Sequence, residues 1–164
     1  MSSYSSLLVD IGGTNMRYAY ANKRNISEEK ILSNISDQKV NKTLGNLLSN
    51  PQIKNAVIAA AGPRLGNRIE MTNRKVIVDG NLLGRKFKLA NSQVLNDWEA
   101  VGYAIDEMKL KSNSKKWNKE VRNHFKKELI KLQRMNTQAA EYSIQRNYLD
   151  LMLDLPWNEY SKDN

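Results

Sequence analysis

The fold is decided by the stretch Leu7-Leu8-Val9-Asp10-Ile11-Gly12-Gly13-Thr14-Asn15-Met16-Arg17. Its first part is a run of apolar residues that only Asp10 interrupts, which predicts a buried strand. Two glycines then let the backbone turn tightly without a Cβ penalty, and an extended segment resumes at Met16. The stretch therefore predicts a β-hairpin.

The turn of this hairpin has an unusual composition. An ordinary two-residue hairpin turn carries Asn-Gly or Asp-Gly. Here a carboxylate ends the strand, and two glycines and a threonine then expose backbone amides and a hydroxyl at one point. Such a point suits a phosphate group. A structural turn with a satisfied Asp10 explains the same residues, because short glycine motifs also occur by chance.

Outward from the hairpin, strands and helices alternate along the chain. Val40, Leu44, Leu47 and Leu48 have the spacing of an amphipathic helix that closes at Pro51. The remaining expected elements are strands at 29–35, 53–61, 68–72, 75–78 and 93–95, a helix capped by Asp79, and a helix over 98–108. This succession indicates an α/β domain with a mixed sheet.

The last third of the chain differs in composition. Residues 109–116 are polar and basic and predict a linker. Apolar residues then recur every three or four positions, first from Trp117 to Leu132 and again from Ile144 to Leu155, with a break at 136–138 and Pro156 at the end. We therefore expect a two-helix α tail over 117–164, after an α/β domain over 1–108.

Charge and composition exclude several functions. The formal charge is +9, but residues 1–108 carry +4, residues 109–135 carry +8 and residues 136–164 carry −3. Lysines scattered on an amphipathic helix indicate a solvated face, so we do not expect nucleic acid as a partner. The chain has no cysteine, which excludes disulfides and thiol nucleophiles. Without a membrane span or a signal peptide, we expect a cytoplasmic protein.

Three further segments extend the first motif into a family resemblance. With Asp10-Ile11-Gly12-Gly13-Thr14-Asn15 and Arg17, and in this order, they resemble the motifs of bacterial glucokinases, a branch of the actin/hexokinase/Hsp70 ATPase superfamily. The segments are Ala59-Ala60-Ala61-Gly62-Pro63, Met71-Thr72-Asn73 and Leu95-Asn96-Asp97-Trp98-Glu99-Ala100-Val101. The resemblance covers about residues 5–108 and implies an RNase-H-like mixed sheet with flanking helices and ATP-dependent phosphorylation of glucose at its 6-hydroxyl.

The resemblance also assigns roles at the phosphate end of such a site. Gly12, Gly13 and Thr14 would face the phosphates of ATP, and Asp10 would help to place Mg²⁺ through water. These assignments agree in kind with the needs of phosphoryl transfer, which requires phosphate held by backbone amides and a cation that neutralises it.

At the sugar end the resemblance makes Asp97 the catalytic base for the 6-hydroxyl, with Asn96 holding neighbouring hydroxyls and Asn73 lining the pocket. A carboxylate after a buried strand, next to an amide that can donate and accept, suits a polyol. An Asn-Asp pair by itself is more often a helix cap.

The tail carries a second resemblance, to the helical segment that precedes the ATPase module of bacterial Lon proteases. It covers about residues 115–164, and Leu155-Pro156-Trp157 is its most telling part. The other matching blocks are Val121-Arg122-Asn123-His124-Phe125-Lys126-Lys127-Glu128-Leu129, Leu132-Gln133-Arg134-Met135-Asn136, Glu141-Tyr142-Ser143 and Asn147-Tyr148-Leu149-Asp150.

Neither resemblance is catalytically complete. The second phosphate motif, the adenosine motif and the remaining sugar ligands of the kinases are missing from this chain, and no G-x-x-x-x-G-K-[S/T] motif occurs in it. We therefore expect a truncated, chimeric glucokinase with weak hexose affinity and no useful turnover alone. Two alternatives stay open: a helical fragment of a Lon-type protease, and a non-enzymatic chimeric binding module whose 117–155 helices dock on a protein.

Overall fold

The computed structural model describes residues 4–23, 25–135 and 139–158. The chain divides into two compact units, Met1–Ala100 and Val101–Asn164. Each unit has its own hydrophobic core, and the two cores have no residue in common. The units are therefore described separately.

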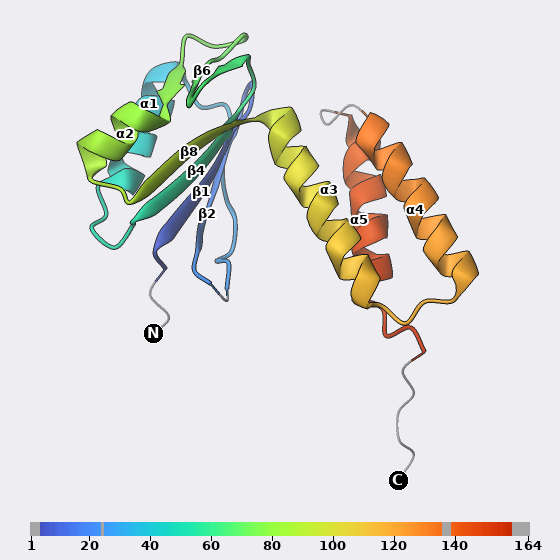
Figure 1. The fold of residues 1–164 in the computed structure, drawn as a ribbon. Helices are drawn as coiled ribbons and strands as arrows, with labels where there is room; N and C mark the ends of the chain where they lie inside the picture. The colour runs from blue at the N-terminus through green and yellow to red at the C-terminus, as the bar shows by residue number, and fades with distance from the viewer. Residues whose placement is uncertain (1–3, 24, 136–138, 159–164) are drawn as a thin grey trace. The chain divides into compact units, whose positions relative to one another are not determined.

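A five-stranded mixed sheet forms the centre of the first unit, in the order β3-β2-β1-β4-β8 (Figure 1). β1 pairs antiparallel with β2 and parallel with β4, and β4 pairs parallel with β8. The strands are β1 (Ser6–Ile11), β2 (Met16–Ala21), β3 (Lys30–Leu32), β4 (Asn55–Ala60) and β8 (Asn91–Asn96).

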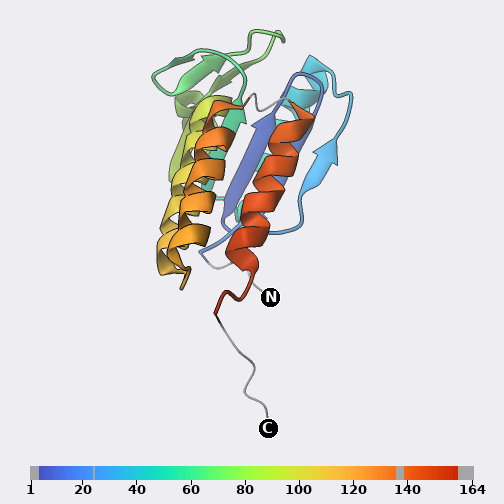
Figure 2. The ribbon, with the colours of Figure 1, turned by 90° about the vertical axis from the view of Figure 1, so that its right-hand side faces the viewer.

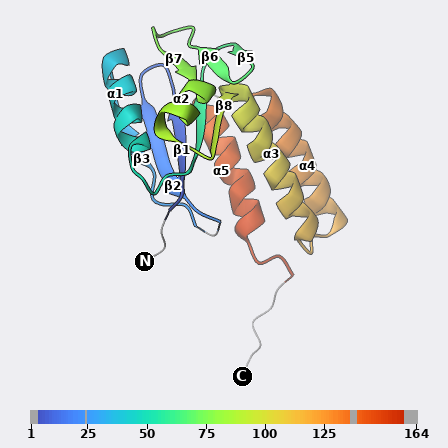
Figure 3. The same ribbon diagram turned by 60° about the vertical axis from the view of Figure 1, so that its left-hand side comes forward.

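Two helices cover one face of this sheet, α1 (Asp37–Leu48) and α2 (Gly80–Phe87) (Figure 3). Leu7, Val9 and Ile11 alternate along β1 and are buried on that face, because successive side chains of a strand point to opposite sides. Asp10 falls between them and lies on the other side of the sheet. The hydrophobic period of β1 thus sets both the core and the direction of the candidate metal-binding carboxylate.

A smaller antiparallel sheet lies between β4 and α2 in the chain. It contains β5 (Arg64–Leu65), β6 (Arg68–Glu70) and β7 (Ile77–Asp79). Ile69 and Val78 are buried and join the core of the first unit. The turn of the β6–β7 hairpin carries Thr72, Asn73 and Arg74, so this sheet delivers the middle motif of the sequence.

The second unit consists of helices that bury one apolar stripe each. α4 (Lys119–Arg134) and α5 (Ala140–Asp154) lie alongside one another (Figure 2). α3 (Asp97–Ser114) begins in the first unit and continues into the second, where it contributes Ile105 and Met108 to the core. The other core residues are Trp117, Phe125, Leu129, Leu132, Tyr142, Leu149, Met152 and Leu153.

The expected α/β succession is confirmed, with one difference in the middle of the chain. The polar stretch 109–116 is not a linker in the structure, because α3 continues through Ser114. Lysine is a good helix former, and Lys109 and Lys111 pair with Asp106 and Glu107 of the preceding turn. The helix therefore has no reason to stop at Met108, and it makes a third helix beside the two of the predicted tail.

The other helix boundaries follow their sequence signals. Asp79 accepts a hydrogen bond from the Leu82 amide at 2.9 Å and caps α2, as its position predicts. α5 ends at Asp154, before Leu155 and Pro156. The predicted break at 136–138 lies outside the described residues. None of the helices in the described ranges is long and apolar enough to cross a membrane.

Candidate functional site

The sheet register brings three of the predicted motifs to one edge. β1, β4 and β8 run parallel, with Ile11 opposite Ala60 and Ala60 opposite Asn96. The chain leaves these three strands at the same end, because parallel strands share the direction in which they finish. The glycine turn after Ile11, the turn at Gly62 and the Asn96-Asp97 pair therefore lie along one edge of the sheet.

The glycine turn leaves two backbone amides free. Gly12 donates its own amide to the Asn15 carbonyl at 2.9 Å, which closes the turn. Among the described residues, nothing accepts a hydrogen bond from the amides of Gly13 or Thr14, and both residues are exposed. A Cβ atom at Gly13 would meet nothing within 4 Å. Two unpaired donors with open space in front of them suit an anion.

Asp10 is the penultimate residue of β1 and lies just before this turn. Although its side chain is exposed, the protein atoms around it remove part of its hydration, and this desolvation raises the pKa of the carboxyl above its usual range. Arg17, its partner across the hairpin, acts in the opposite direction, whereas the charges of Asp97 and Glu29 raise the pKa further. The charge of Asp97 therefore acts on Asp10 in the same direction as desolvation.

The Asn96-Asp97 turn is held by hydrogen bonds to its own neighbours. The Asn96 side-chain amide donates to the Gly62 carbonyl at 2.6 Å, and its oxygen accepts from the Trp98 amide at 2.8 Å. One N–H and one lone pair of this side chain are left for a ligand hydroxyl. Asp97 is half-buried and accepts from the Trp98 amide at 3.0 Å, so its second carboxylate oxygen is available.

Arg64 and Glu99 support this turn, and neither was selected from the sequence. Glu99 accepts a hydrogen bond from the Asn96 amide at 2.8 Å and pairs with Arg64 at 3.3 Å. Arg64 also donates to the Val94 carbonyl at 3.1 Å. The two side chains thus fix the end of β8 just before Asp97. The position of Glu99, three residues after Asn96 at a helix start, is the capping-box signal that could have found it.

Arg74 is the third residue that the sequence analysis missed. Its side chain is only 5% exposed, and its Nε donates to the Gly13 carbonyl at 2.8 Å. It also approaches Asp37, the first residue of α1, at 3.4 Å, and the Lys75 amide donates to the same carboxylate at 3.1 Å. Arg74 therefore holds the outer side of the glycine turn and directs its free amides away from the protein.

A glycine is required at position 62 because two backbone segments of the chain approach each other closely there. A Cβ atom at this position would collide with the backbone carbonyl oxygen of Glu70. The same residue accepts the hydrogen bond from Asn96. The turn between β4 and β5 therefore borders the site, as the sequence predicts for Gly62-Pro63, and shapes it through its backbone.

Asn73 is the predicted residue with the least support. It is exposed in the β6–β7 turn, and no described residue makes a hydrogen bond with its side chain. Its neighbour Arg74 connects this turn to Gly13 rather than to Asn96 or Asp97. The structure thus assembles the predicted phosphate residues and the Asn96-Asp97 pair at one edge, and ties the Asn73 turn to the phosphate side.

The donor set fits a hydrated magnesium ion with a nucleotide. The described residues contain no group of three or more acidic, histidine or cysteine side chains that could enclose a metal ion. Mg²⁺ keeps several waters and usually binds through one or two carboxylates plus substrate phosphates. The exposed Asp10 beside two free amides fits this mode of Mg²⁺ binding, since the amides would hold the phosphate and the carboxylate would face the ion.

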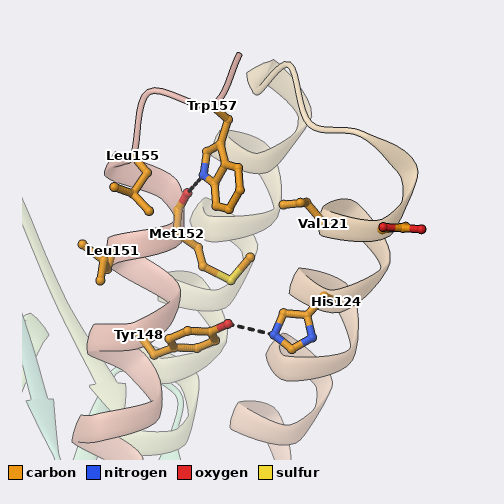
Figure 4. A pocket seen from close by; sticks show the side chains of 8 residues that line it. Val121, His124, Tyr148, Leu151, Met152, Leu155 and Trp157 are labelled. Carbon is orange, nitrogen blue, oxygen red and sulfur yellow. Dashed lines mark hydrogen bonds between the residues drawn. The ribbon is translucent and has the colours of Figure 1, made fainter. Parts of the chain in front are cut away.

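The second unit has a different kind of cavity, with a volume of about 330 Å³ (Figure 4). His124 and Tyr148 close one end with a 2.8 Å hydrogen bond between Nε2 and the hydroxyl. At the other end the Trp157 ring is fixed by a hydrogen bond from Nε1 to the Met152 carbonyl at 2.6 Å. The remaining lining residues are Glu120, Val121, Leu151 and Leu155.

Comparisons with known proteins match this chain to two families. The family model described as Glucokinase matches residues 7–127. A glucokinase of Campylobacter jejuni subsp. doylei is 33% identical over 110 residues, which are 65% of this chain and 33% of that protein. A solved glucokinase of Balamuthia mandrillaris, in complex with glucose, is 22% identical and aligns with a TM-score of 0.51 over 65% of this chain and 33% of its own. That structure supports the fold alone.

A shorter segment is similar to Lon proteases. The Flavobacterium johnsoniae Lon protease is 56% identical over 59 residues, which are 36% of this chain and 7% of that protein. The Lon protease of Karelsulcia muelleri is 57% identical over 60 residues, with 37% and 7% covered. The chain thus spans about a third of the glucokinase that it matches and a small part of each Lon protease.

Proposed function

The chain belongs to the glucokinase family, and from this membership we propose that its first unit is one half of a sugar kinase site, with ATP and a hexose such as glucose as its ligands. The observation that supports this proposal is the shared edge of β1, β4 and β8. It holds the free amides of Gly13 and Thr14 and the Asn96-Asp97 pair. Phosphate donors and a hydroxyl acceptor are needed at one place for phosphoryl transfer.

In this proposal the glycine turn binds the nucleotide. The amides of Gly13 and Thr14 donate to phosphate oxygens, while Gly12 shapes the turn through its own hydrogen bond to Asn15. Asp10 orients the hydration shell of Mg²⁺. The bound Mg-ATP supplies the phosphoryl group and the neutralising charge. Arg74 is the positioning residue that fixes the Gly13 peptide.

The Asn96-Asp97 turn binds the sugar. The free oxygen of Asp97 accepts the proton of the 6-hydroxyl, and the remaining donor and acceptor of Asn96 hold a neighbouring hydroxyl. Asn73 has no hydrogen bond to another described residue, so its side chain is available to a ligand at the rim. Glu99 and Arg64 keep the turn in the orientation that these contacts need.

We expect weak sugar affinity and no useful turnover from this chain by itself. The chain spans a third of the length of the glucokinase that it matches. Asp10, Gly13 and Thr14 are exposed, and an exposed site offers a ligand fewer contacts and less exclusion of water than a closed one. A displacement of about 1 Å can cost on the order of a hundredfold in rate. Alignment of the ATP phosphate with the sugar hydroxyl would therefore need further groups besides those at this edge.

A second candidate function comes from the second unit. Its identity of 56% over 59 residues to a Lon protease favours a helical module of the kind found in those proteins. In that case the helices would act as a protein-binding or scaffolding element, and the sheet would have no part in the function. The apolar cavity between α4 and α5 would then be the functional site.

A coupled assay with purified chain, Mg-ATP and glucose tests the first proposal, together with glucose titration by calorimetry. We expect calorimetry to show a heat of glucose binding that the Asp97→Ala variant abolishes. In the coupled assay we expect no turnover near the ordinary enzyme range of about 1 s⁻¹ or above. The Glu28→Ala variant, at an exposed loop residue outside the edge, serves as the control for folding. Tight glucose binding that survives Asp97→Ala would refute the role of Asp97, and rapid turnover would refute the half-site.

A further inference from the structure

We propose that α5 is the interface of a homodimer, in which two copies of the chain pair antiparallel through this helix. The evidence is a largely exposed apolar stripe on α5, in which only Tyr148 has a described hydrogen-bond partner, His124 of α4. Ile144 is 69% exposed, Tyr148 41%, Leu151 57% and Leu155 42%. This inference concerns the second unit and does not rest on the sugar kinase proposal.

The spacing of the stripe is that of a helix-pairing seam. Its members follow one another at intervals of four, three and four residues, which is the a/d pattern of a coiled coil. The opposite stripe of α5, which contains Leu149, Met152 and Leu153, is already buried in the core of the unit. α5 therefore has two apolar faces, and only one of them is used inside the chain.

The second half of the stripe borders the cavity between α4 and α5. Leu151 and Leu155 form the α5 wall, and Val121 contributes from α4 (Figure 4). The cavity of about 330 Å³ is large enough for a branched aliphatic side chain. Ile144, the most exposed member of the stripe, lies at the other half and is not among the residues that line this cavity. The same helix face thus carries a projecting residue and a recess.

Only an antiparallel pair brings these two features together. In that orientation Ile144 of one copy lies opposite Leu155 of the other, and Tyr148 lies opposite Leu151, because a positions face d positions. Each copy then places Ile144 at the mouth of the partner's cavity, twice in one interface. A two-fold symmetric contact requires this self-complementarity.

The polar residues beside the seam permit the pairing. Asp150 is neutralised within the helix by Arg146 at 3.7 Å. In the antiparallel pair Asn147 of one copy faces Asp154 of the other, which is an amide donor opposite a carboxylate. No pair of like charges is forced together along the seam, so the second copy is a better occupant than a strongly acidic or basic helix.

The contact is small, because the seam spans about three helical turns, or roughly 16 Å. Interfaces below about 1,200 Å² in total are typical of weak association. We therefore expect a concentration-dependent dimer with a dissociation constant in the micromolar range or above rather than an obligate one.

Sedimentation equilibrium of the full chain, at about 10 µM to 1 mM, is the first test. We expect the mass to rise from monomer toward dimer, and Ile144→Glu and Leu151→Glu each to weaken association at least tenfold. Leu110→Glu changes an equally exposed leucine on α3 (70%) and should leave association unchanged. Circular dichroism confirms that each variant stays helical. A monomer at 1 mM, or equal loss in all three variants, would overturn the proposal.

The register is tested by cross-linking, since the chain has no cysteine of its own. A mixture of Ile144→Cys and Leu155→Cys chains, treated with a short bis-maleimide, should give a covalent heterodimer. Either variant alone should give at least fivefold less, because the two ends of the stripe come together only between antiparallel copies. Cross-linking of Ile144→Cys with itself as the main product would show a parallel pair and overturn the antiparallel assignment.

Discussion

The two units of this chain differ in where their polar groups lie. In the first unit, the parallel strands β1, β4 and β8 end at one edge and leave free amides and carboxylates there. In the second unit, the buried residues are apolar and the cavity has a hydrogen-bonded His124–Tyr148 pair at its end. The first arrangement is suited to binding a charged, hydroxylated ligand, and the second to packing against a protein.

The comparison also shows that identity and functional content are separate quantities. A segment of 59 residues is 56% identical to a Lon protease, and a segment of 110 residues is 33% identical to a glucokinase. Yet the weaker match covers 33% of its relative, whereas the stronger match covers only 7% of its relative. The share of the relative that is covered, more than the percentage of identical residues, therefore indicates how much of its function a chain can have.

The largest expected effect separates the two cores. Phe125 is 1% exposed and lies in the core of the second unit. Phe125→Ala should destabilise that unit by about 3–5 kcal/mol, because it removes an aromatic ring and leaves a cavity. Hydrogen exchange should show loss of protection in α4 and α5 and unchanged protection in β1 and β4. Equal loss in both units would show that they unfold as one.

A smaller effect is expected at the edge of the first unit. Gly62→Ala forces a Cβ atom against the Glu70 carbonyl, which should cost about 3 kcal/mol of unfolding free energy. The Asn96 hydrogen bond to Gly62 should be lost with it, so glucose binding should weaken too. Gly45→Ala is the matched control, since a Cβ there meets nothing within 4 Å in α1. Denaturant melts of both variants decide whether the close approach is real.

A substitution of Arg74 tests whether its hydrogen bond to the Gly13 carbonyl fixes the glycine turn. Arg74→Ala removes the donor to the Gly13 carbonyl and should cost about 1–2 kcal/mol of stability. Because the turn then loses its orientation, affinity for ATP should fall several-fold more than stability alone explains. Arg85→Ala, an exposed arginine on α2, should change neither quantity. A variant that binds ATP normally would remove Arg74 from the account.

The smallest expected effect concerns Asp10 and depends on pH. Its pKa is raised in the folded state, so the folded chain holds a proton more tightly than the unfolded chain does. Stability contributed by this group is therefore present below its unfolded pKa of about 3.9 and is lost as the pH rises through the folded pKa.

Asp10→Asn should accordingly stabilise the chain at pH 7, by less than about 1 kcal/mol because the side chain is exposed. At pH 3 the gain should vanish. Thermal melts at both pH values, with Glu28→Gln as an exposed control, measure this difference. Destabilisation at pH 7 would mean that the carboxylate has a favourable partner in the fold.

Local signals in the sequence were sufficient for most of the fold. The apolar run from Leu7 to Ile11 predicted a buried strand, and Asp79 predicted the start of α2, because both signals depend on near neighbours. Arg74 could not be found in this way, since its partner Gly13 is 61 residues away. The continuation of α3 was missed because polarity was interpreted as a linker, while the i,i+3 and i,i+4 ion pairs within 106–111 favour a helix.

The central claim is that the sheet edge of the first unit, and not the helical unit, binds the nucleotide. Titration of the ¹⁵N-labelled full chain with Mg-ATP, followed by amide NMR, tests it most directly. We predict that the Gly13 and Thr14 amides shift first and furthest, that Asn96 follows only when glucose is added, and that the amides of α4 stay in place. Shifts confined to α4 and α5, or none at Gly13 and Thr14 with saturating Mg-ATP, would contradict the claim.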